Sequence, residues 1–382
     1  MKFKRSAATA LASVLMLSAC STSSSDSGTS DTSGKAGKKV AAALKTAVQD
    51  ATGSQTKWQG PTTGPKAQKG KSIVYVSQTQ QNAGSAGVAK GLEEAGNSLG
   101  WDVKVIDGKG TLTGMVAALN QAIALKPDGI VLGSVPTTGT ESQVKKAVDS
   151  GIAVVGWHAS DNPGKVADSP LFTNVTSKPA DIAYVAGAYA IVESGGDAQA
   201  IQYTDLTYSI CREKDAGFKK AFAQNSTSKI IKTESFPFGS MAQRTPSIAR
   251  ANIQRYASKG FNWMIAINDG YFDYAIPALR AAGMKSGGKI RLIAAGDGSE
   301  TAYERIRQGN FQEATIPEPL NEHGWIVADE LNRSMAGEEP SNFVTPVHLV
   351  DKDNVDKDGG DGNVYEPADG YRDQYKKIWG IS

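Results

Sequence analysis

Residues 72–106 read SIVYVSQTQQNAGSAGVAKGLEEAGNSLGWDVKVI and contain one complete strand–helix–strand unit. The β-branched run at 72–78 predicts a buried strand, the amphipathic segment 86–99 predicts a helix, and 102–106 predicts a second strand. Two strands joined through a helix run parallel in one sheet, with a right-handed crossover. This unit predicts an α/β fold if the alternation continues.

The alternation does continue. The next predicted elements are helices over 112–125 and 141–149 and strands over 130–133 and 152–157. After a break at 173–178, a second series begins, with helices over 180–193, 211–223, 241–257, 270–282 and 301–307 and strands over 198–203, 230–236, 263–267 and 290–295. A helix over 321–335 and the segments 343–350 and 368–379 close the chain. We therefore expect two Rossmann-like lobes with parallel-type sheets.

Length and composition agree with two globular lobes. The chain has 382 residues, of which 40% are hydrophobic, enough for two domains that each bury a core. Its 41 Lys and Arg residues nearly balance its 39 Asp and Glu residues. A net charge of +2 gives no broad basic field for a polyanion, so nucleic-acid binding is not expected.

The amino terminus is typical of an export signal. Three basic residues lie within the first five, before an apolar run at 6–19 that is too short for a permanent membrane span. The sequence at 17–20, Leu-Ser-Ala-Cys, resembles the bacterial lipobox, in which the cysteine is diacylated. We expect a lipoprotein signal peptide at 1–19 and lipidation of Cys20. The alternative is an ordinary signal peptide in which Cys20 is incidental.

A Ser/Thr-rich segment follows. Residues 21–39 contain ten Ser and Thr residues and a single apolar residue, so they can bury little surface on folding. We expect the segment 20–71 to be a lipid-anchored flexible tether, although a weak helical pattern occurs at 40–52. Because Cys20 would carry lipid, Cys211 has no disulfide partner and is expected to be a buried thiol.

Open α/β sheets bind ligands beyond the carboxyl ends of their strands. Two lobes that face each other would therefore enclose a cleft between the loops at their strand ends. The polar and aromatic loops expected at this cleft are 78–84, 133–138, 157–161, 204–209, 268–271, 296–299 and 316–321.

Short motifs between residue 71 and about residue 350 match one protein family in order and spacing. They are VAKGLEEA at 88–95, ALKPDGIVL at 124–132, Ala249, Asn252 and Gln254 ahead of AIND at 266–269, AAGDGS at 294–299, and ATIPEP at 314–319 before Gly324 and Trp325. The chain resembles the sugar-type periplasmic binding proteins of the type I fold, which capture ligands for ABC importers.

The resemblance implies three crossings between the lobes, near Asn174, Glu318 and Pro346. The N-terminal lobe would then contain 72–174 plus 319–345, and the C-terminal lobe 175–318 plus 346–382. A hinge of this kind lets a ligand that contacts both lobes select the closed state.

The resemblance also implies a binding role for individual residues of this sequence. Arg212 matches an arginine of the second lobe's first site helix, and its guanidinium can hold paired hydroxyls or a carboxylate. Asn268 matches an amide that both donates and accepts, and Asp297 matches an aspartate that accepts two hydroxyl protons. Glu318 falls where the family often has Gln or Asn, and Asn82 matches a first-lobe asparagine.

The first lobe departs from the family pattern. The usual stacking aromatics are absent beside Asn82, and His158 with Ala159 replaces an Asp-Arg pair. Trp157 is the expected substitute platform for an apolar ring face, and His158 adds a polar group beside it. Further aromatic candidates are Tyr208, Tyr271 and Phe272.

Each candidate also has a structural interpretation. Trp157 could belong to the core, and His158 could be an ordinary loop residue. Asp297 could stabilise its own turn, and Arg212 could form an ion pair with a neighbouring carboxylate.

The sequence gives no indication of catalysis. The three histidines lack metal-ligand spacing, and no cysteine pair could form a zinc site. GPKAQKGKS at 64–72 has one residue too many between its glycines for a phosphate loop, and no Gly-x-Ser-x-Gly elbow is present. We expect no enzyme activity, no cofactor and no metal site.

The expected function is that of an extracytoplasmic solute-binding lipoprotein. It would capture a small polar ligand, such as a sugar or polyol, and deliver it to an ABC permease and its ATPase. The protein would be a monomer, held at the outer face of the cell membrane by its lipid anchor alone. The alternative is a ligand-sensing lipoprotein that presents the small molecule to a receptor kinase or chemoreceptor.

Overall fold

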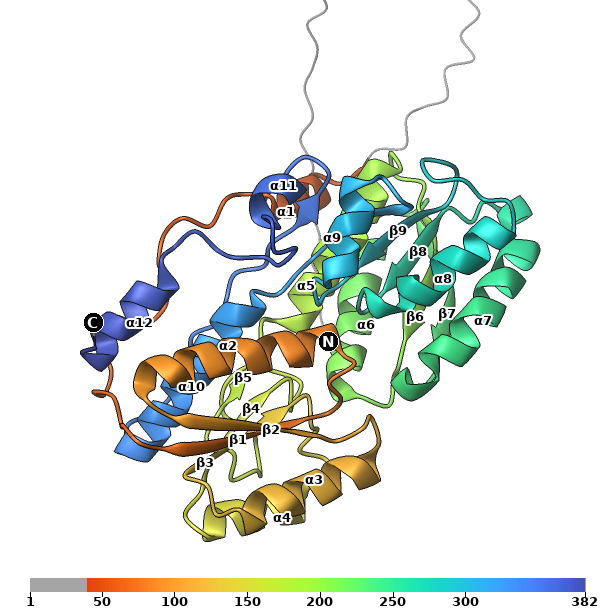
Figure 1. The fold of residues 1–382 in the computed structure, drawn as a ribbon. Helices are drawn as coiled ribbons and strands as arrows, with labels where there is room; N and C mark the ends of the chain where they lie inside the picture. The colour runs from red at the N-terminus through yellow and green to blue at the C-terminus, as the bar shows by residue number, and fades with distance from the viewer. Residues whose placement is uncertain (1–39, 382) are drawn as a thin grey trace, which may run out of the picture. The chain divides into compact units, whose positions relative to one another are not determined.

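The computed structural model describes residues 40–381 (Figure 1). The predicted signal peptide at 1–19, Cys20 and the first part of the predicted tether lie outside the described residues. None of the described helices combines the length and apolar character needed to cross a membrane. The predicted fold class is confirmed, because the chain forms two α/β lobes with largely parallel sheets.

The first lobe is built on a parallel sheet in the order β2-β1-β3-β4-β5. Its strands are β1 (Ser72–Ser77), β2 (Asp102–Asp107), β3 (Gly129–Gly133), β4 (Ala153–Trp157) and β5 (Asn174–Val175). Side chains alternate between the two faces of a strand, so Ile73 and Tyr75 enter one core and Val74 and Val76 another. The prediction misses β5, because a strand of two residues has no periodic pattern.

Helices cover both faces of this sheet (Figure 1). The helices α2 (Ala83–Leu99) and α10 (Leu320–Ala336) pack on one face, together with Tyr75. The helices α3 (Leu112–Ala124) and α4 (Glu141–Asp149) pack on the other, together with Val76. The loops at the carboxyl ends of the strands therefore lie at the edge of the sheet, between the two helical layers that cover its faces.

The second lobe is built on a sheet in the order β11-β10-β9-β8-β6-β7, with β11 antiparallel to its neighbour. Its strands are β6 (Gln199–Thr204), β7 (Lys229–Ser235), β8 (Trp263–Ala266), β9 (Arg291–Ala294), β10 (Gln312–Thr315) and β11 (Val350–Asp351). The prediction misses β10, whose residues, QEAT, do not form a β-branched apolar run.

Two pairs of helices enclose this second sheet (Figure 1). The helices α5 (Pro179–Glu193) and α6 (Ser209–Phe222) pack against each other on one face, and α7 (Met241–Tyr256) and α8 (Gly270–Ala281) on the other. The shorter α9 (Glu300–Arg307) lies against β10, and α11 (Val355–Asp358) lies against α9.

The carboxyl-terminal helix α12 (Tyr371–Trp379) packs on the first lobe, although residues 346–382 are expected in the second. Its aromatic residues recur at helical spacing and meet Trp325 of α10. The Trp379 ring stacks on Trp325 with 5.4 Å between centroids, and its Nε1 donates to Asp329 at 2.8 Å. The expected assignment is therefore wrong for residues 371–379, and the other lobe boundaries remain predictions.

The described part of the predicted tether is not a free linker. Residues 42–51 form α1, which buries Leu44 in the second lobe's core. Farther along the chain, Trp58 packs against Phe343, and the Asn332 side chain accepts from Gln68 N at 2.8 Å and donates to Pro65 O at 3.2 Å. The expectation of a flexible tether is thus wrong for residues 40–71, because apolar and aromatic side chains in this segment bind both lobes.

Candidate functional site

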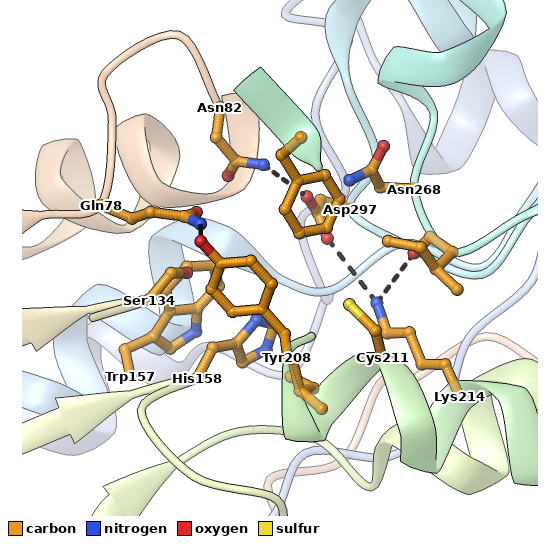
Figure 2. A pocket seen from close by; sticks show the side chains of 13 residues that line it. Gln78, Asn82, Ser134, Trp157, His158, Tyr208, Cys211, Lys214, Asn268 and Asp297 are labelled. Carbon is orange, nitrogen blue, oxygen red and sulfur yellow. Dashed lines mark hydrogen bonds and ion pairs between the residues drawn. The ribbon is translucent and has the colours of Figure 1, made fainter. Parts of the chain in front are cut away.

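A pocket lies between the two lobes at the carboxyl ends of the strands (Figure 2). Its lining residues are Gln78, Asn82, Ser134, Trp157 and His158 from the first lobe, and Tyr208, Ile210, Cys211, Lys214, Phe238, Ile267, Asn268 and Asp297 from the second. It contains about 430 Å³ of space outside protein atoms, part of it open to solvent. Doubly wound sheets place ligand sites at this position.

Asn82 connects the two lobes through its side chain. Its Oδ1 caps α2 by accepting from Ser85 N at 2.8 Å, so its Nδ2 remains available and donates to Asp297 Oδ2 at 3.3 Å (Figure 2). This approach requires glycine at position 84, because a Cβ there would lie 2.9 Å from the same carboxylate oxygen.

A second hydrogen bond crosses the pocket nearby. Gln78 directly follows β1, and its Nε2 donates to Tyr208 Oη at 2.7 Å (Figure 2). Tyr208 is the residue that precedes α6 in the second lobe. Burial raises the pKa of Tyr208 above its ordinary value, so its hydroxyl is neutral at pH 7. It can therefore accept from Gln78 while still donating its own proton.

Asp297 lies in the loop after β9, and a buried carboxylate holds that loop in place. Asp269 Oδ2 accepts from the backbone N–H groups of Gly298 at 2.9 Å and Ser299 at 3.3 Å. Gln312 Nε2 donates to Asp269 Oδ1 at 2.6 Å. Burial raises the pKa of Asp269 to about 6, and the Arg305 charge opposes this rise. Asp269 is therefore mainly ionised at pH 7 and fixes the position of Asp297.

Lys214 supplies the positive charge of the pocket. It lies one helical turn after Ile210 on the buried face of α6. Its Nζ donates to the carbonyl oxygen of Ile267 at 3.1 Å and lies 3.8 Å from Asp297 Oδ1. Only 5% of the Lys214 side chain and 12% of the Asp297 side chain are exposed. This pair is thus opposite in charge but not joined by a short hydrogen bond.

Trp157 and His158 form the wall contributed by the first lobe. Their rings stack with 3.9 Å between centroids and 12° between planes. The Nε2 of His158 lies 2.9 Å from Glu318 Oε2. Burial alone would raise the pKa of Glu318, but the His158 charge and hydrogen bond outweigh it, and the pKa falls well below its ordinary value. Glu318 is therefore an ionised group that orients His158 from behind.

His323 fixes the other ring of this wall. Its Nδ1 accepts from Trp157 Nε1 at 3.0 Å, and its Nε2 lies 2.8 Å from Thr345 Oγ1. Burial lowers the pKa of His323 to about 4, although the Glu318 charge opposes this change. The imidazole is therefore neutral at pH 7. Because Nδ1 accepts from Trp157, its single proton lies on Nε2, facing Thr345.

Six of the ten candidate ligand-binding residues line this pocket: Asn82, Trp157, His158, Tyr208, Asn268 and Asp297. The other four do not. Arg212 is exposed, and its Nη1 donates to two carbonyl oxygens of the preceding loop at 2.9 and 3.1 Å. Tyr271 and Phe272 are buried in the second lobe's core, and Glu318 lies behind His158. Contact with a ligand remains a prediction for every one of these residues.

Sequence reasoning missed several lining residues. Helical periodicity could have identified Lys214, because it lies on the apolar face of α6 whereas Arg212 does not. Gln78 and Ser134 lie in the loops 78–84 and 133–138 that were expected at the cleft, because each residue follows a strand directly, but neither was named as a binding residue. Phe238 comes from a short 3₁₀ turn, Phe238–Ser240, for which the sequence gives no comparable signal.

Cys211 is the buried thiol that the sequence predicts. It is 2% exposed, and burial raises its pKa to about 12, so it is a neutral part of the pocket wall. Among residues 40–381, no group of three or more His, Cys, Asp or Glu side chains is arranged to hold a metal ion.

A family model for the periplasmic binding protein domain matches residues 73–339. Solved structures with this fold include a galactofuranose binding protein, with 19% identity and a TM-score of 0.66 over 82% of this chain and 99% of that chain. A sugar ABC transporter protein from Yersinia enterocolitica gives 16% identity and a TM-score of 0.68, over 88% and 97%. A myo-inositol binding protein from Caulobacter gives 16% and 0.64, over 75% and 94%. Comparison with curated protein sequences gave no match.

Proposed function

We propose that this chain, which belongs to the periplasmic binding protein family, captures a small neutral hydroxylated ligand such as a sugar or polyol and delivers it to an ABC importer. The observation that carries the proposal is the polar second-lobe wall, made of Lys214, Asn268 and Asp297. These groups face the aromatic wall of Trp157 and His158 across the pocket.

The polar wall keeps hydrogen-bonding capacity for a ligand. Lys214 has three N–H donors, of which one is bonded to Ile267 O. Asn268 Oδ1 accepts from Gly270 N at 3.2 Å, and its Nδ2 has no partner among the described residues. Asp297 Oδ1 accepts no hydrogen bond from the described residues and lies 3.8 Å from Lys214 Nζ. Neighbouring hydroxyls, each both a donor and an acceptor, match this mixture of groups.

Charge balance favours a neutral ligand. Lys214 and Asp297 offset each other in the pocket, and Glu318 offsets any charge on His158. A carboxylate or phosphate that binds Lys214 would also approach the Asp297 carboxylate. The repulsion between these two negative groups is stronger in a buried site, where the dielectric constant is low. A polyol adds no charge, so the attraction between Lys214 and Asp297 is kept when it binds.

The two lobes would close around such a ligand. Asn82 and Asp297 already meet across the pocket, as do Gln78 and Tyr208. A hydroxylated molecule between them can replace each direct contact with contacts to both lobes. Since those contacts exist only when the lobes are close, the ligand favours the closed state, which is the form that a membrane permease would distinguish.

Attachment to the membrane would come from lipid on Cys20, outside the described residues. The motif Leu-Ser-Ala-Cys at 17–20 and the Ser/Thr-rich segment after it support this part of the proposal. Mass spectrometry of the mature protein should find a diacylated amino-terminal Cys20, and Cys20→Ser should prevent this modification. An unmodified Cys20 in the mature wild-type protein would contradict the lipid anchor and leave the ligand site unaffected.

Thermal unfolding of the purified mature protein tests the ligand class. D-Galactose and D-galacturonate form a matched pair that differs in one carboxylate, and L-arabinose and myo-inositol extend the neutral set. A neutral compound at a hundred times its Kd should stabilise the folded protein by about 2.7 kcal/mol. The matched acid should stabilise it much less. If only acids bind, or if no hydroxylated compound binds, the proposed function is wrong.

Uptake by cells then tests delivery to the importer. Deleting this chain should abolish uptake of the labelled compound identified by thermal unfolding, and restoring the wild-type chain should recover it. A response to the compound that persists without permease and ATPase would instead assign the protein to sensing.

A further inference from the structure

A second pocket adjoins the first and shares the side chain of Tyr208 with it. It lies between the same two lobes, with Thr137, Ser160 and Asp161 on the first-lobe side and Tyr208, Ser209 and Arg212 on the second-lobe side. About 1170 Å³ of space outside protein atoms, part of it open to solvent, is associated with this pocket. A second opening between the lobes therefore lies on the other side of Tyr208 from the first pocket.

Arg212 presents unused donors to this second pocket. Its Nη1 is held by the carbonyl oxygens of Leu206 at 2.9 Å and Thr207 at 3.1 Å, which fixes the plane of the guanidinium. Its Nε and Nη2 have no partner among the described residues. Sequence reasoning placed Arg212 in the ligand site, and the structure places it one pocket away.

Asp161 supplies acceptors from the other lobe. Its carboxylate is half-buried in the loop after β4 and has no partner among the described residues. The second pocket thus has one guanidinium and one carboxylate on opposite walls, as the first has one ammonium and one carboxylate. Hydroxyl groups can bond to both kinds of side chain without adding charge.

The remaining walls suit the apolar face of a ring. Leu112, Met115 and Val166 contribute aliphatic surface from the first lobe, and Leu112 is 48% exposed. Tyr208 lines both pockets, and its ring, which packs against Phe238 with 5.2 Å between centroids, adds aromatic surface to this wall. A sugar ring offers hydroxyls at its edge and C–H groups on its faces, so this combination of walls matches a second sugar unit better than a lipid or a phosphate.

We propose that the cleft holds a glycoside of two units, one in each pocket, and that the second pocket selects disaccharides or glycosylated polyols over single sugars. This inference rests on the proposed function, because the first unit occupies the site between Trp157 and Asp297. It assigns Arg212 and Asp161 to the second unit. Binding of both units bridges the lobes at two places and adds contacts that favour closure.

Calorimetry with the mature protein tests the proposal. The probes are D-galactose, D-glucose, L-arabinose and myo-inositol, compared with lactose, melibiose, maltose, cellobiose, arabinobiose and galactinol. At least one two-unit compound should bind tenfold or more tightly than either of its units. If a single unit binds as tightly as every compound that contains it, the second subsite is wrong while the proposed function stands.

A variant that fills the second pocket provides an independent comparison. Ala167 lines this pocket and is exposed, so Ala167→Trp adds bulk there without disturbing a core. The ratio of two-unit to one-unit affinity should fall about tenfold or more. Lys165→Trp is the matched control, since Lys165 is exposed in the same loop and lines neither pocket. Its affinity ratio should equal that of the wild type.

Each remaining outcome is also decisive. An unchanged affinity ratio in Ala167→Trp would overturn the second subsite, even if the affinities for one-unit and two-unit ligands both fell equally. Arg212→Gln should lower the same ratio, because it removes the free donors, and an unchanged ratio would overturn the role of Arg212. If no compound binds at all, the proposed function itself is wrong and this inference falls with it.

Discussion

The two walls of the pocket differ in what satisfies their polar groups. On the first-lobe wall, Trp157 is bonded to His323 and His158 is paired with Glu318, so protein partners occupy both rings. On the second-lobe wall, Lys214 and Asp297 approach only to 3.8 Å, and within residues 40–381 Lys214 makes a single hydrogen bond. The polar groups of the first-lobe wall therefore find their partners within the folded protein, whereas those of the second-lobe wall keep hydrogen-bonding capacity for a ligand.

This difference separates the energetic roles of the two walls. Substitutions in the aromatic wall should act mainly on the free energy of unfolding, because the buried partners lose their contacts. Substitutions in the polar wall should act mainly on affinity, because few protein partners depend on them. Measuring both stability and ligand affinity for each variant therefore tests this difference between the two walls.

Trp157→Ala should have the largest effect. The indole is fully buried, so its removal leaves a large cavity and an unpaired His323 Nδ1, and the free energy of unfolding should fall by about 3–5 kcal/mol. Denaturant unfolding measures this loss. Trp157→Phe, which keeps a stacked ring but not the hydrogen bond, should lose less. A stable Trp157→Ala protein with weakened binding would contradict the structural role.

Asp297→Ala should lower affinity about ten to a hundredfold while changing stability little, because ligand hydroxyls lose their acceptor. Calorimetry measures the affinity. Small-angle scattering should show that the variant stays open at ligand concentrations that compact the wild type. Glu300→Ala is a matched control, since Glu300 is an exposed carboxylate nearby that does not line the pocket. Equal affinities for Asp297→Ala and the wild type would restrict Asp297 to shaping its loop.

The aromatic wall should also make stability depend on pH through His323. The folded pKa is about 4, below the ordinary value of 6.5, so the unfolded chain binds more protons in this window. The contribution to stability is complete above pH 6.5 and is lost as the pH falls toward 4. Between pH 7.5 and pH 5 the loss should be about 2 kcal/mol.

A comparison of wild type with His323→Gln isolates this effect. Asp269 and Glu330 have raised pKa values and change stability in the opposite direction over the same range, so the difference between the proteins is the relevant measurement. Glu318, whose pKa is lowered, contributes its loss only below about pH 4.5. Identical pH profiles for the two proteins would mean that His323 is not a neutral buried group.

Tyr271→Phe should have the smallest effect. The Tyr271 hydroxyl is buried and has no hydrogen-bond partner among the described residues, so its removal should leave stability unchanged or slightly increased. Ligand affinity should also stay within a factor of two, since Tyr271 does not line the pocket. A tenfold loss of affinity would restore the sequence-based prediction that Tyr271 binds the ligand.

Local patterns were sufficient for much of the fold. Alternating apolar runs and amphipathic segments predicted β1, α2 and the later units, because strand and helix periodicities are properties of neighbouring residues. Short elements such as β5 and β10 were missed, because a strand of two residues has no periodic pattern and QEAT is not a β-branched apolar run. The placement of α12 on the first lobe likewise depended on Trp325, more than forty residues away in sequence.

For the site, strand-end positions were enough to predict the loops that line the cleft, because parallel sheets put those loops on one edge, and the family resemblance singled out Asn268 and Asp297 within them. The folded structure was needed to show that Lys214 lines the pocket and Arg212 the neighbouring one, because side chains two positions apart on a helix point about 200° apart. The folded structure was also needed to show that the Glu318 carboxylate pairs with His158 and does not line the pocket. Which buried charge pairs with which is set by distances between segments remote in sequence, and no local pattern encodes them.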